Sequence, residues 1–256
     1  MTACDLRQRI TLPQAPRNAS PVPWLTSVHS TTNRGPWGHS SYRGNCDGYL
    51  IKDLLQYFQP RRVLDPMTGG GTCRDVCRDL GIPCVSFDLK AGQDAGDPAS
   101  YADIAPVDFV WLHPPYWRMI RYSGDARCLS NAPDLDSFLA RLRNLLQLCR
   151  SRLTSSGHIA VLIGGYADRQ ERRHIPLPAL STAAAMQAGL WPACTDIVRF
   201  QHGNTSSRSS YHSSFIPGLH DVCTVYTPRD RSALQTAPTE ASCQAKEGGA
   251  HDRQHR

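Results

Sequence analysis

One stretch constrains the fold of this chain more than any other. The apolar pair Val63-Leu64 leads into Asp65-Pro66-Met67-Thr68-Gly69-Gly70-Gly71-Thr72, and a helical run begins at Cys73. Glycine has no Cβ, so such a turn can adopt positive φ and lets a ligand approach bare backbone. Strand, glycine turn and helix in this order predict a ligand site at the carboxyl end of a parallel strand. The turn lacks Gly-Lys-Ser/Thr and Gly-x-Gly-x-x-Gly, which disfavours a phosphate-binding loop and a dinucleotide site.

A second apolar strand ends in a polar residue, two prolines and an aromatic residue. It comprises Asp108-Phe109-Val110-Trp111-Leu112, and His113-Pro114-Pro115-Tyr116 follows directly. The prolines fix φ and carry no N–H, so they make the corner rigid and leave their carbonyl groups free. Strands also alternate with helices along the chain, which predicts a mostly parallel sheet with helices on both faces.

In this order and spacing, the two motifs resemble those of the S-adenosylmethionine-dependent amino-methyltransferases that act on N6 of adenine or N4 of cytosine in DNA. The first motif of that family reads Asp-Pro-Phe-x-Gly-Ser-Gly-Thr, and the second reads Asp, Asn or Ser, then Pro-Pro and Tyr, Phe or Trp. The resemblance runs over residues 42–226. It implies an α/β, Rossmann-like methyltransferase fold; the strands expected at 195–201 and 222–227 predict a closing β-hairpin at the sheet edge.

The resemblance implies S-adenosylmethionine as cofactor and assigns residues to it. In the glycine turn these residues are Asp65, Met67, Gly69, Gly71 and Thr72. Asn45, in the loop before the helix that precedes the turn, is assigned to the cofactor as well. The spacing itself points to Asp88, about 20 residues past the turn, as an acceptor for both ribose hydroxyls. Asp97, in Gly-Asp-Pro, is assigned to the adenine amino group as in the third family motif, with Asp94 as its competitor.

The chemistry that the resemblance implies depends on position and polarity. The lone pair of an exocyclic amino group is conjugated into the base, and fixed acceptors for the amino hydrogens draw it toward the methyl donor. His113 would accept one hydrogen and the Pro114 carbonyl the other. Pro115 would keep the corner rigid, and Tyr116 would stack on a base flipped out of duplex DNA.

His113 departs from the Asp, Asn or Ser of the family. A neutral imidazole offers one acceptor nitrogen and an imidazolium offers none, so activity is expected to fall as the pH drops through the His113 pKa. The departure leaves open a nucleic-acid-binding module that has lost activity. A second alternative is the same chemistry on RNA or on a protein amide, because related folds carry similar Pro-Pro-Tyr corners.

Composition sets outer bounds. The chain has 256 residues and a net charge of +6, which suits a polyanionic partner such as DNA. No apolar run is long enough for a membrane span, and the first ten residues contain no secretory signal. The ten cysteines form no Cys-x-x-Cys pair, so we expect reduced thiols in a cytoplasmic protein and no metal site.

The expected organisation has three parts. Residues 1–40 are predicted to be an extended arm, 41–228 the methyltransferase domain and 229–256 a disordered tail. No target-recognition domain fits between the two motifs. Sequence preference is therefore expected to be short or supplied by a partner, and no signal indicates an oligomeric state. The loops at 118–133, 165–178 and 202–220 are the candidate DNA contacts, with Arg118, Arg121, Arg199 and Arg208 as candidates for phosphates.

Overall fold

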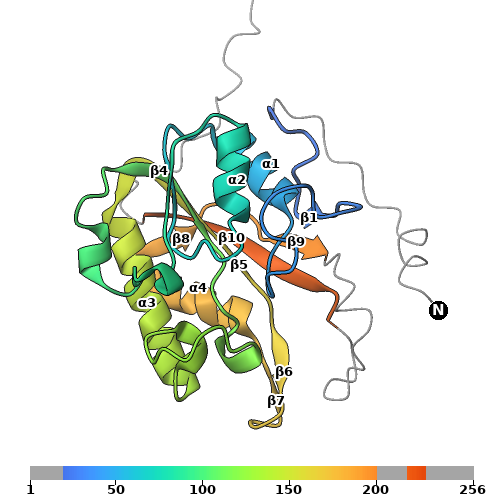
Figure 1. Ribbon diagram of the computed structural model, residues 1–256. Helices are drawn as coiled ribbons and strands as arrows, with labels where there is room; N and C mark the ends of the chain where they lie inside the picture. The colour runs from blue at the N-terminus through green and yellow to red at the C-terminus, as the bar shows by residue number, and fades with distance from the viewer. Residues whose placement is uncertain (1–19, 201–217, 229–256) are drawn as a thin grey trace, which may run out of the picture.

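The computed structural model of this chain describes residues 20–200 and 218–228. These residues build one open mixed sheet with helices on both faces, and a small hairpin projects from it (Figure 1). The strands of the main sheet are β1 Val28–His29, β2 Val63–Asp65, β3 Cys84–Ser86, β4 Val107–Leu112, β5 Leu153–Ile163, β8 Leu190–Pro192, β9 Ile197–Phe200 and β10 His220–Pro228. The hairpin consists of β6 Tyr166–Asp168 and β7 Arg173–Ile175, and the α-helices are α1 Gly48–Phe58, α2 Thr72–Asp79, α3 Leu135–Ser151 and α4 Leu177–Gln187.

The strand order in the main sheet is β1-β9-β10-β5-β4-β2-β3, and β8 also pairs with β10. Strands β3, β2, β4 and β5 run parallel to one another, whereas β10 is antiparallel to both β5 and β9. The predicted α/β, Rossmann-like class is thereby confirmed. Because β2, β3 and β4 are parallel, their carboxyl ends meet at one edge, where ligands bind in open α/β sheets.

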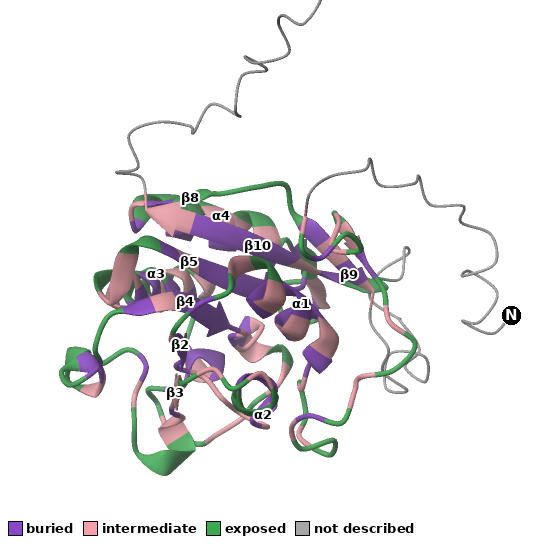
Figure 2. Cartoon of the chain, turned by 90° about the horizontal axis from the view of Figure 1, so that it is seen from above, coloured by how far each residue is buried: buried purple, intermediate pink, exposed green. Residues whose placement is uncertain are grey.

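Two hydrophobic cores lie on opposite faces of the sheet (Figure 2). The side chains of a strand alternate between faces, so Phe109 and Trp111 of β4 pack with α1 and α2. Val110 and Leu112 pack with α3 and α4. The glycine turn and the proline corner therefore extend from strands that are buried on both sides.

The predicted hairpin exists, but it is not the sheet edge. β9 and β10 pair in antiparallel fashion, and β1 then adds to β9 in parallel, with Val28 opposite Val198. Within residues 20–40, β1 and Trp37 therefore contact the rest of the domain. Trp37 is buried and donates from Nε1 to Asp79 at 2.6 Å, whereas Trp24 is 63% exposed and does not anchor the segment.

Helix boundaries follow their caps. Helix α1 begins directly after Asp47, which caps it by accepting from the Leu50 N–H. Asp134 caps α3 in the same way through the Ser137 N–H. Strand β5 begins at Leu153, close behind the end of α3 at Ser151. Its register against β4 shifts between Val107 and Phe109, which accommodates the polar Ser155-Ser156-Gly157 segment.

Some expectations fall outside the described residues, namely the tail 229–256, most of the loop 202–220 with Arg208, and the first nineteen residues. Within the described parts of the chain, no helix combines the length and apolarity that a membrane span requires.

Candidate active site

The glycine turn is shaped by two left-handed glycines. Gly69 has φ +47° and Gly71, which precedes α2, has φ +81°. A Cβ on Gly69 would lie 3.0 Å from the Tyr42 ring, so both the conformation and the space favour glycine there. The turn is held by backbone hydrogen bonds from the Thr68 N–H to the Phe87 carbonyl (3.1 Å) and from the Gly71 N–H to the Thr68 carbonyl (2.7 Å).

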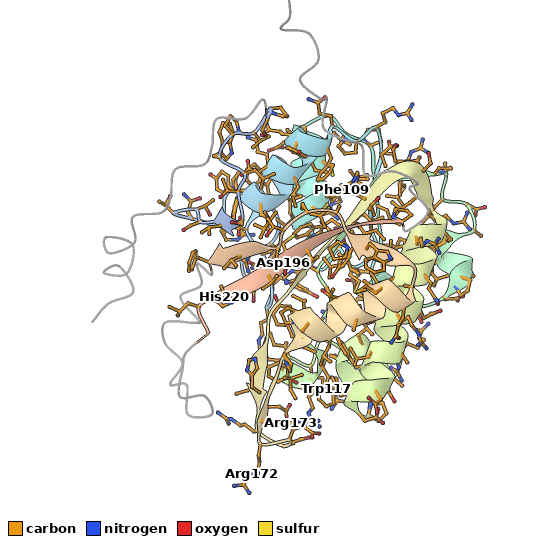
Figure 3. The ribbon with its side chains drawn as sticks, turned by 180° about the vertical axis from the view of Figure 1, so that it is seen from behind. Phe109, Trp117, Arg172, Arg173, Asp196 and His220 are labelled. Carbon is orange, nitrogen blue, oxygen red and sulfur yellow. The ribbon has the colours of Figure 1, made fainter. Side chains whose placement is uncertain are left out.

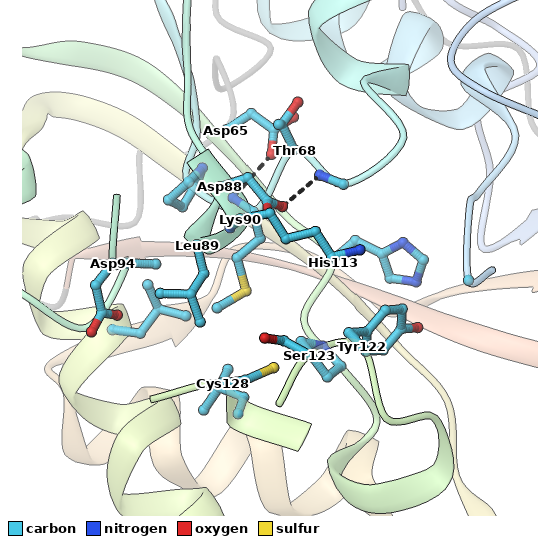
Figure 4. A pocket seen from close by; sticks show the side chains of 18 of the residues that line it. Asp65, Thr68, Asp88, Leu89, Lys90, Asp94, His113, Tyr122, Ser123 and Cys128 are labelled. Carbon is cyan, nitrogen blue, oxygen red and sulfur yellow. Dashed lines mark hydrogen bonds between the residues drawn. The ribbon is translucent and has the colours of Figure 1, made fainter. Parts of the chain in front are cut away.

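A cavity of about 670 Å³ opens at this edge of the sheet (Figure 4). It is bounded by the glycine turn, the segment after β3, the proline corner and the loop that follows the corner. Of the residues predicted for the cofactor, six line it, namely Asn45, Asp65, Met67, Gly69, Thr72 and Asp88. Gly71 and Asp97 do not belong to the lining, and of the proline corner His113 and Pro115 do. A cavity of this size is typical for a small-molecule or cofactor site.

Asp88 occupies the position expected of a ribose acceptor. One of its carboxylate oxygens accepts from the Gly69 N–H at 3.1 Å, and the other accepts from the Lys90 N–H at 2.9 Å. Each oxygen has two lone pairs, so one remains available on each for a ligand. The two backbone bonds fix the carboxylate beside the turn.

The structure brings Asp94 rather than Asp97 to the cavity. Asp97 turns away and caps the short 3₁₀-helix Pro98–Tyr101, with the Ala99 N–H donating to it at 2.9 Å. Asp94 lies in the cavity wall, and its side chain accepts from the Gly96 N–H at 2.8 Å. The sequence could not separate the two, because both acids stand in the same turn-rich link.

Two further polar groups in the cavity wall lie beneath the turn. Asp65 is 2% exposed, and burial, with Cys84 nearby, raises the pKa of its carboxyl to about 8. The Thr68 hydroxyl lies near this carboxyl, but its buried Oγ1 makes no hydrogen bond of good geometry with the described residues. A buried polar atom without a partner is costly in a finished structure, which indicates that a ligand could complete it.

The loop before α1 covers the outer side of the cavity. Asn45 organises this loop, because its side-chain nitrogen donates to the carbonyls of His39, Ser40 and Tyr42 at 2.9–3.2 Å. The Tyr42 ring stacks on the ring of Tyr122 from the loop after the corner, with centroids 6.1 Å apart. Residues from two distant segments therefore close the cavity on this side.

At the proline corner, the side chain of His113 is oriented by Tyr116. The Tyr116 hydroxyl lies 3.2 Å from His113 Nε2 and is also hydrogen-bonded to Asp221. If the hydroxyl donates to the carboxylate, its oxygen can accept only from a protonated Nε2, which leaves Nδ1 of His113 as the acceptor. Burial, together with the nearby Arg199, lowers the pKa of His113 to about 4, so the ring is neutral at physiological pH.

Sequence reasoning missed the buried ion cluster behind the corner. Arg199 of β9 donates to Asp47 at 3.0 Å and pairs with Asp221 of β10. Arg199 is 7% exposed, so the prediction that it contacts phosphate was wrong. The side chain is turned inward by two carboxylates that lie far from it in the sequence.

Tyr116 is the aromatic residue of the proline corner. Its ring packs near Gly164, where an added Cβ would lie 2.9 Å from Tyr116 Cε2, and it does not line the cavity. Its stacking on a base stays a prediction. The aromatic rings that do line the cavity belong to Tyr42, Trp111 and Tyr122.

The corner is tied to the β6–β7 hairpin through Arg118. This arginine donates two hydrogen bonds to Asp168, at 2.9 and 2.8 Å, and a third to Glu171 at 3.0 Å. It is therefore committed to the hairpin and not free for a phosphate. Beyond this anchor, Arg169, Arg172 and Arg173 are exposed, and Figure 3 shows Arg172 and Arg173 at the hairpin tip, away from the domain.

Comparison with known proteins shows a likeness in fold only. No protein-family model and no curated sequence matches the chain. Among solved structures, the chain is similar to a candidate DNA modification methylase from Thermus thermophilus in complex with S-adenosyl-L-methionine, with 17% identity over 69% of this chain and 59% of that one and a TM-score of 0.39. TrmN from Thermus thermophilus has 17% identity over 73% and 50% of the two chains and a TM-score of 0.39.

A third similar structure is the Burkholderia thailandensis 1,6-didemethyltoxoflavin-N1-methyltransferase, with bound S-adenosylhomocysteine. It has 15% identity over 72% of this chain and 78% of that one, and a TM-score of 0.44. The chain spans only half to three fifths of the length of the two Thermus proteins.

Proposed function

We propose that this chain transfers a methyl group from S-adenosylmethionine to an exocyclic amino group of a DNA base, N6 of adenine or N4 of cytosine. The observation that carries the proposal is one cavity with the glycine turn and Asp88 at one side and the neutral, oriented imidazole of His113 at the other.

The residues present fit the cofactor. The two oxygens of Asp88 retain acceptor capacity for ribose hydroxyls, and Asp94 in the cavity wall can accept from the adenine amino group. Thr68 Oγ1 offers a buried polar atom without a partner among the described residues, and Asn45 lies in the loop that covers the same cavity. S-adenosylmethionine, when bound, supplies an electrophilic methyl group.

The remaining chemistry falls to the proline corner. Nδ1 of His113 would accept one hydrogen of the target amino group, and the Pro114 carbonyl would accept the other. Both interactions draw the nitrogen lone pair out of conjugation and hold it toward the methyl donor. With a pKa near 4, His113 retains this acceptor over the whole physiological range.

The β6–β7 hairpin supports a nucleic-acid substrate. Three exposed arginines, Arg169, Arg172 and Arg173, lie on it. Arg118, in the segment that follows the proline corner, binds Asp168 and Glu171 at the turn end of the hairpin. A two-stranded ribbon of this kind fits the major groove of B-DNA, and arginines meet its phosphates. Sequence preference would be short, or a partner protein would supply it.

The experiment is transfer of labelled methyl from S-adenosylmethionine to mixed-sequence DNA, to RNA and to protein, each alone. We expect label in DNA that resists protease and is lost in Asp65→Ala and His113→Ala; digestion to nucleosides then identifies the base. Label in RNA or in protein, and not in DNA, would identify RNA or protein as the substrate. Cofactor binding without transfer to any acceptor would show a binding module without activity.

A further inference from the structure

The structure brings together three cysteines that the sequence keeps apart. Cys73 and Cys77 lie four residues apart on α2, which places both on one face of the helix. Cys84 is the first residue of β3, the strand next to that face. The Sγ atoms of all three lie within 4.8 Å of one another. The sequence predicted no metal site, because the spacing between Cys84 and the other cysteines is not typical of zinc ligands. Its apolar neighbours instead indicate a thiol packed in the core.

The three thiols differ in their exposure to solvent. Cys73 is 2% and Cys77 0% exposed, and both pack in the apolar core formed by α1, α2 and the sheet. Cys84 is half-buried, and its thiol makes a weak 3.7 Å hydrogen bond to the Val85 carbonyl. Access from solvent is therefore through Cys84, with the two buried sulfurs behind it.

We propose that Cys73, Cys77 and Cys84 form a three-thiolate site for a thiophilic d¹⁰ cation, Zn²⁺ or Cu⁺. With a metal–sulfur distance of about 2.3 Å, the sulfurs around a tetrahedral or trigonal ion are about 3.8–4.0 Å apart. The three sulfurs lie within 4.8 Å of one another, so each pair needs to close by at most about 1 Å to reach this spacing. Soft thiolates select these ions over Mg²⁺ or Ca²⁺.

The location gives the ion a structural consequence. The ion would join α2 to β3. Cys73 directly follows Thr72, and both residues line the cofactor cavity. Binding releases the thiol protons to solvent as the metal–sulfur bonds form. Cys73 belongs to the walls of both sites, but the metal proposal does not depend on the proposed methyl transfer.

The test is metal binding by the full chain, reduced and stripped with a chelator. Zn²⁺ and, in a separate anaerobic arm, Cu⁺ are titrated in competition with a chelator of known affinity. We expect one equivalent of at least one ion, and an affinity at least about 100-fold weaker in Cys84→Ser, since even outer-shell changes cost about 10–100-fold. Cys194→Ser, which changes an exposed thiol outside the cluster, should bind as the wild type does.

A second measurement needs no variant. Co²⁺ added to the wild-type chain should give the intense ultraviolet charge-transfer absorption of thiolate ligands, and bound metal should protect Cys84 from alkylation of the native protein. No stoichiometric binding of either ion, equal affinity in Cys84→Ser, or unchanged alkylation of Cys84 would overturn the proposal.

Discussion

The Tyr116 hydroxyl lies 3.2 Å from Nε2 of His113 and is hydrogen-bonded to Asp221 on its other side. Behind Asp221 stands Arg199, which also pairs with Asp47 at the start of α1. The proline corner is therefore oriented from within the protein, by a chain of polar contacts that reaches the neighbouring strands. If the Tyr116 hydroxyl donates to Asp221, Nδ1 of His113 is left as the acceptor nitrogen, and this leads to the first prediction.

Tyr116→Phe should lower the rate of methyl transfer while leaving the fold intact. The change removes the hydroxyl that fixes the protonated nitrogen of His113, and one such hydrogen bond is worth about 1–3 kcal/mol when a buried partner is left unpaired, or roughly 10-fold to 100-fold in rate. Single-turnover rates at saturating cofactor would measure it. An unchanged rate would mean that the imidazole needs no support from Tyr116.

The pH profile provides a second prediction. The pKa of His113 is about 4 in the folded chain and about 6.5 when unfolded. The unfolded chain therefore binds one proton more between these values, and His113 should lower the free energy of unfolding progressively as the pH falls from 6.5 to 4, by up to about 3 kcal/mol. Above pH 6.5, the titration of His113 should not change the free energy of unfolding. Activity should stay flat until the pH approaches 4.

Denaturant unfolding from pH 4 to 7 would measure this effect, with His113→Asn as the matched control. Other groups titrate in the same range in both proteins, so the difference between the two curves isolates His113. A difference that does not change with pH would contradict the lowered pKa.

Gly164→Ala should destabilise the corner. A Cβ there would collide with Asp221 Oδ1 and lie 2.9 Å from Tyr116 Cε2. Forcing atoms into a packed site costs typically about 1–3 kcal/mol. Gly124→Ala is the matched control, since a Cβ at that position meets nothing within 4 Å. Equal unfolding free energies for the two variants would show that the close approach at Gly164 is not required.

Arg118→Lys should weaken the link between the corner and the hairpin. A lysine cannot reproduce the two parallel hydrogen bonds to Asp168, and the loss of charged hydrogen bonds of this type costs about 1–3 kcal/mol. Arg61→Lys changes an exposed pair with Asp108 at 3.8 Å and should cost less than about 1 kcal/mol. Urea midpoints of both variants would measure the two losses of stability. A larger loss in Arg61→Lys than in Arg118→Lys would contradict the prediction.

Trp37 tests whether the segment before α1 belongs to the domain. Trp37→Ala removes a buried ring and its bond to Asp79 and should cost about 3–5 kcal/mol. Trp24→Ala, at a ring that is 63% exposed, should change stability by less than about 0.5 kcal/mol. Thermal unfolding of both variants would measure these changes. A loss of stability in Trp37→Ala as small as that in Trp24→Ala would contradict the inclusion of this segment in the domain.

The sequence predicts well what local patterns determine. The apolar spacing and the polar cap of 48–58 give α1 its bounds, and the strand that ends in Asp65 places the glycine turn at the sheet edge. The distance along the chain from the turn to Asp88 likewise predicts the carboxylate beside it. These features depend on residues close to one another along the chain.

What the sequence does not reveal depends on contacts between distant segments. Arg199 looks like a surface cation until β10 and the cap of α1 place Asp221 and Asp47 around it. Cys84 joins Cys73 only because β3 packs beside α2. Asp94 and Asp97 differ only in the direction of their side chains, which the short 3₁₀-helix after Asp97 decides.

The most direct test of the central claim is calorimetric titration of S-adenosylmethionine into the wild-type chain, Asp88→Ala and Asp97→Ala. We expect binding at one site, an affinity about 10-fold to 100-fold weaker in Asp88→Ala because two charge-assisted hydrogen bonds are lost, and no change in Asp97→Ala. No binding by the wild type, or an equal loss in both variants, would contradict the assignment of the cavity to this cofactor.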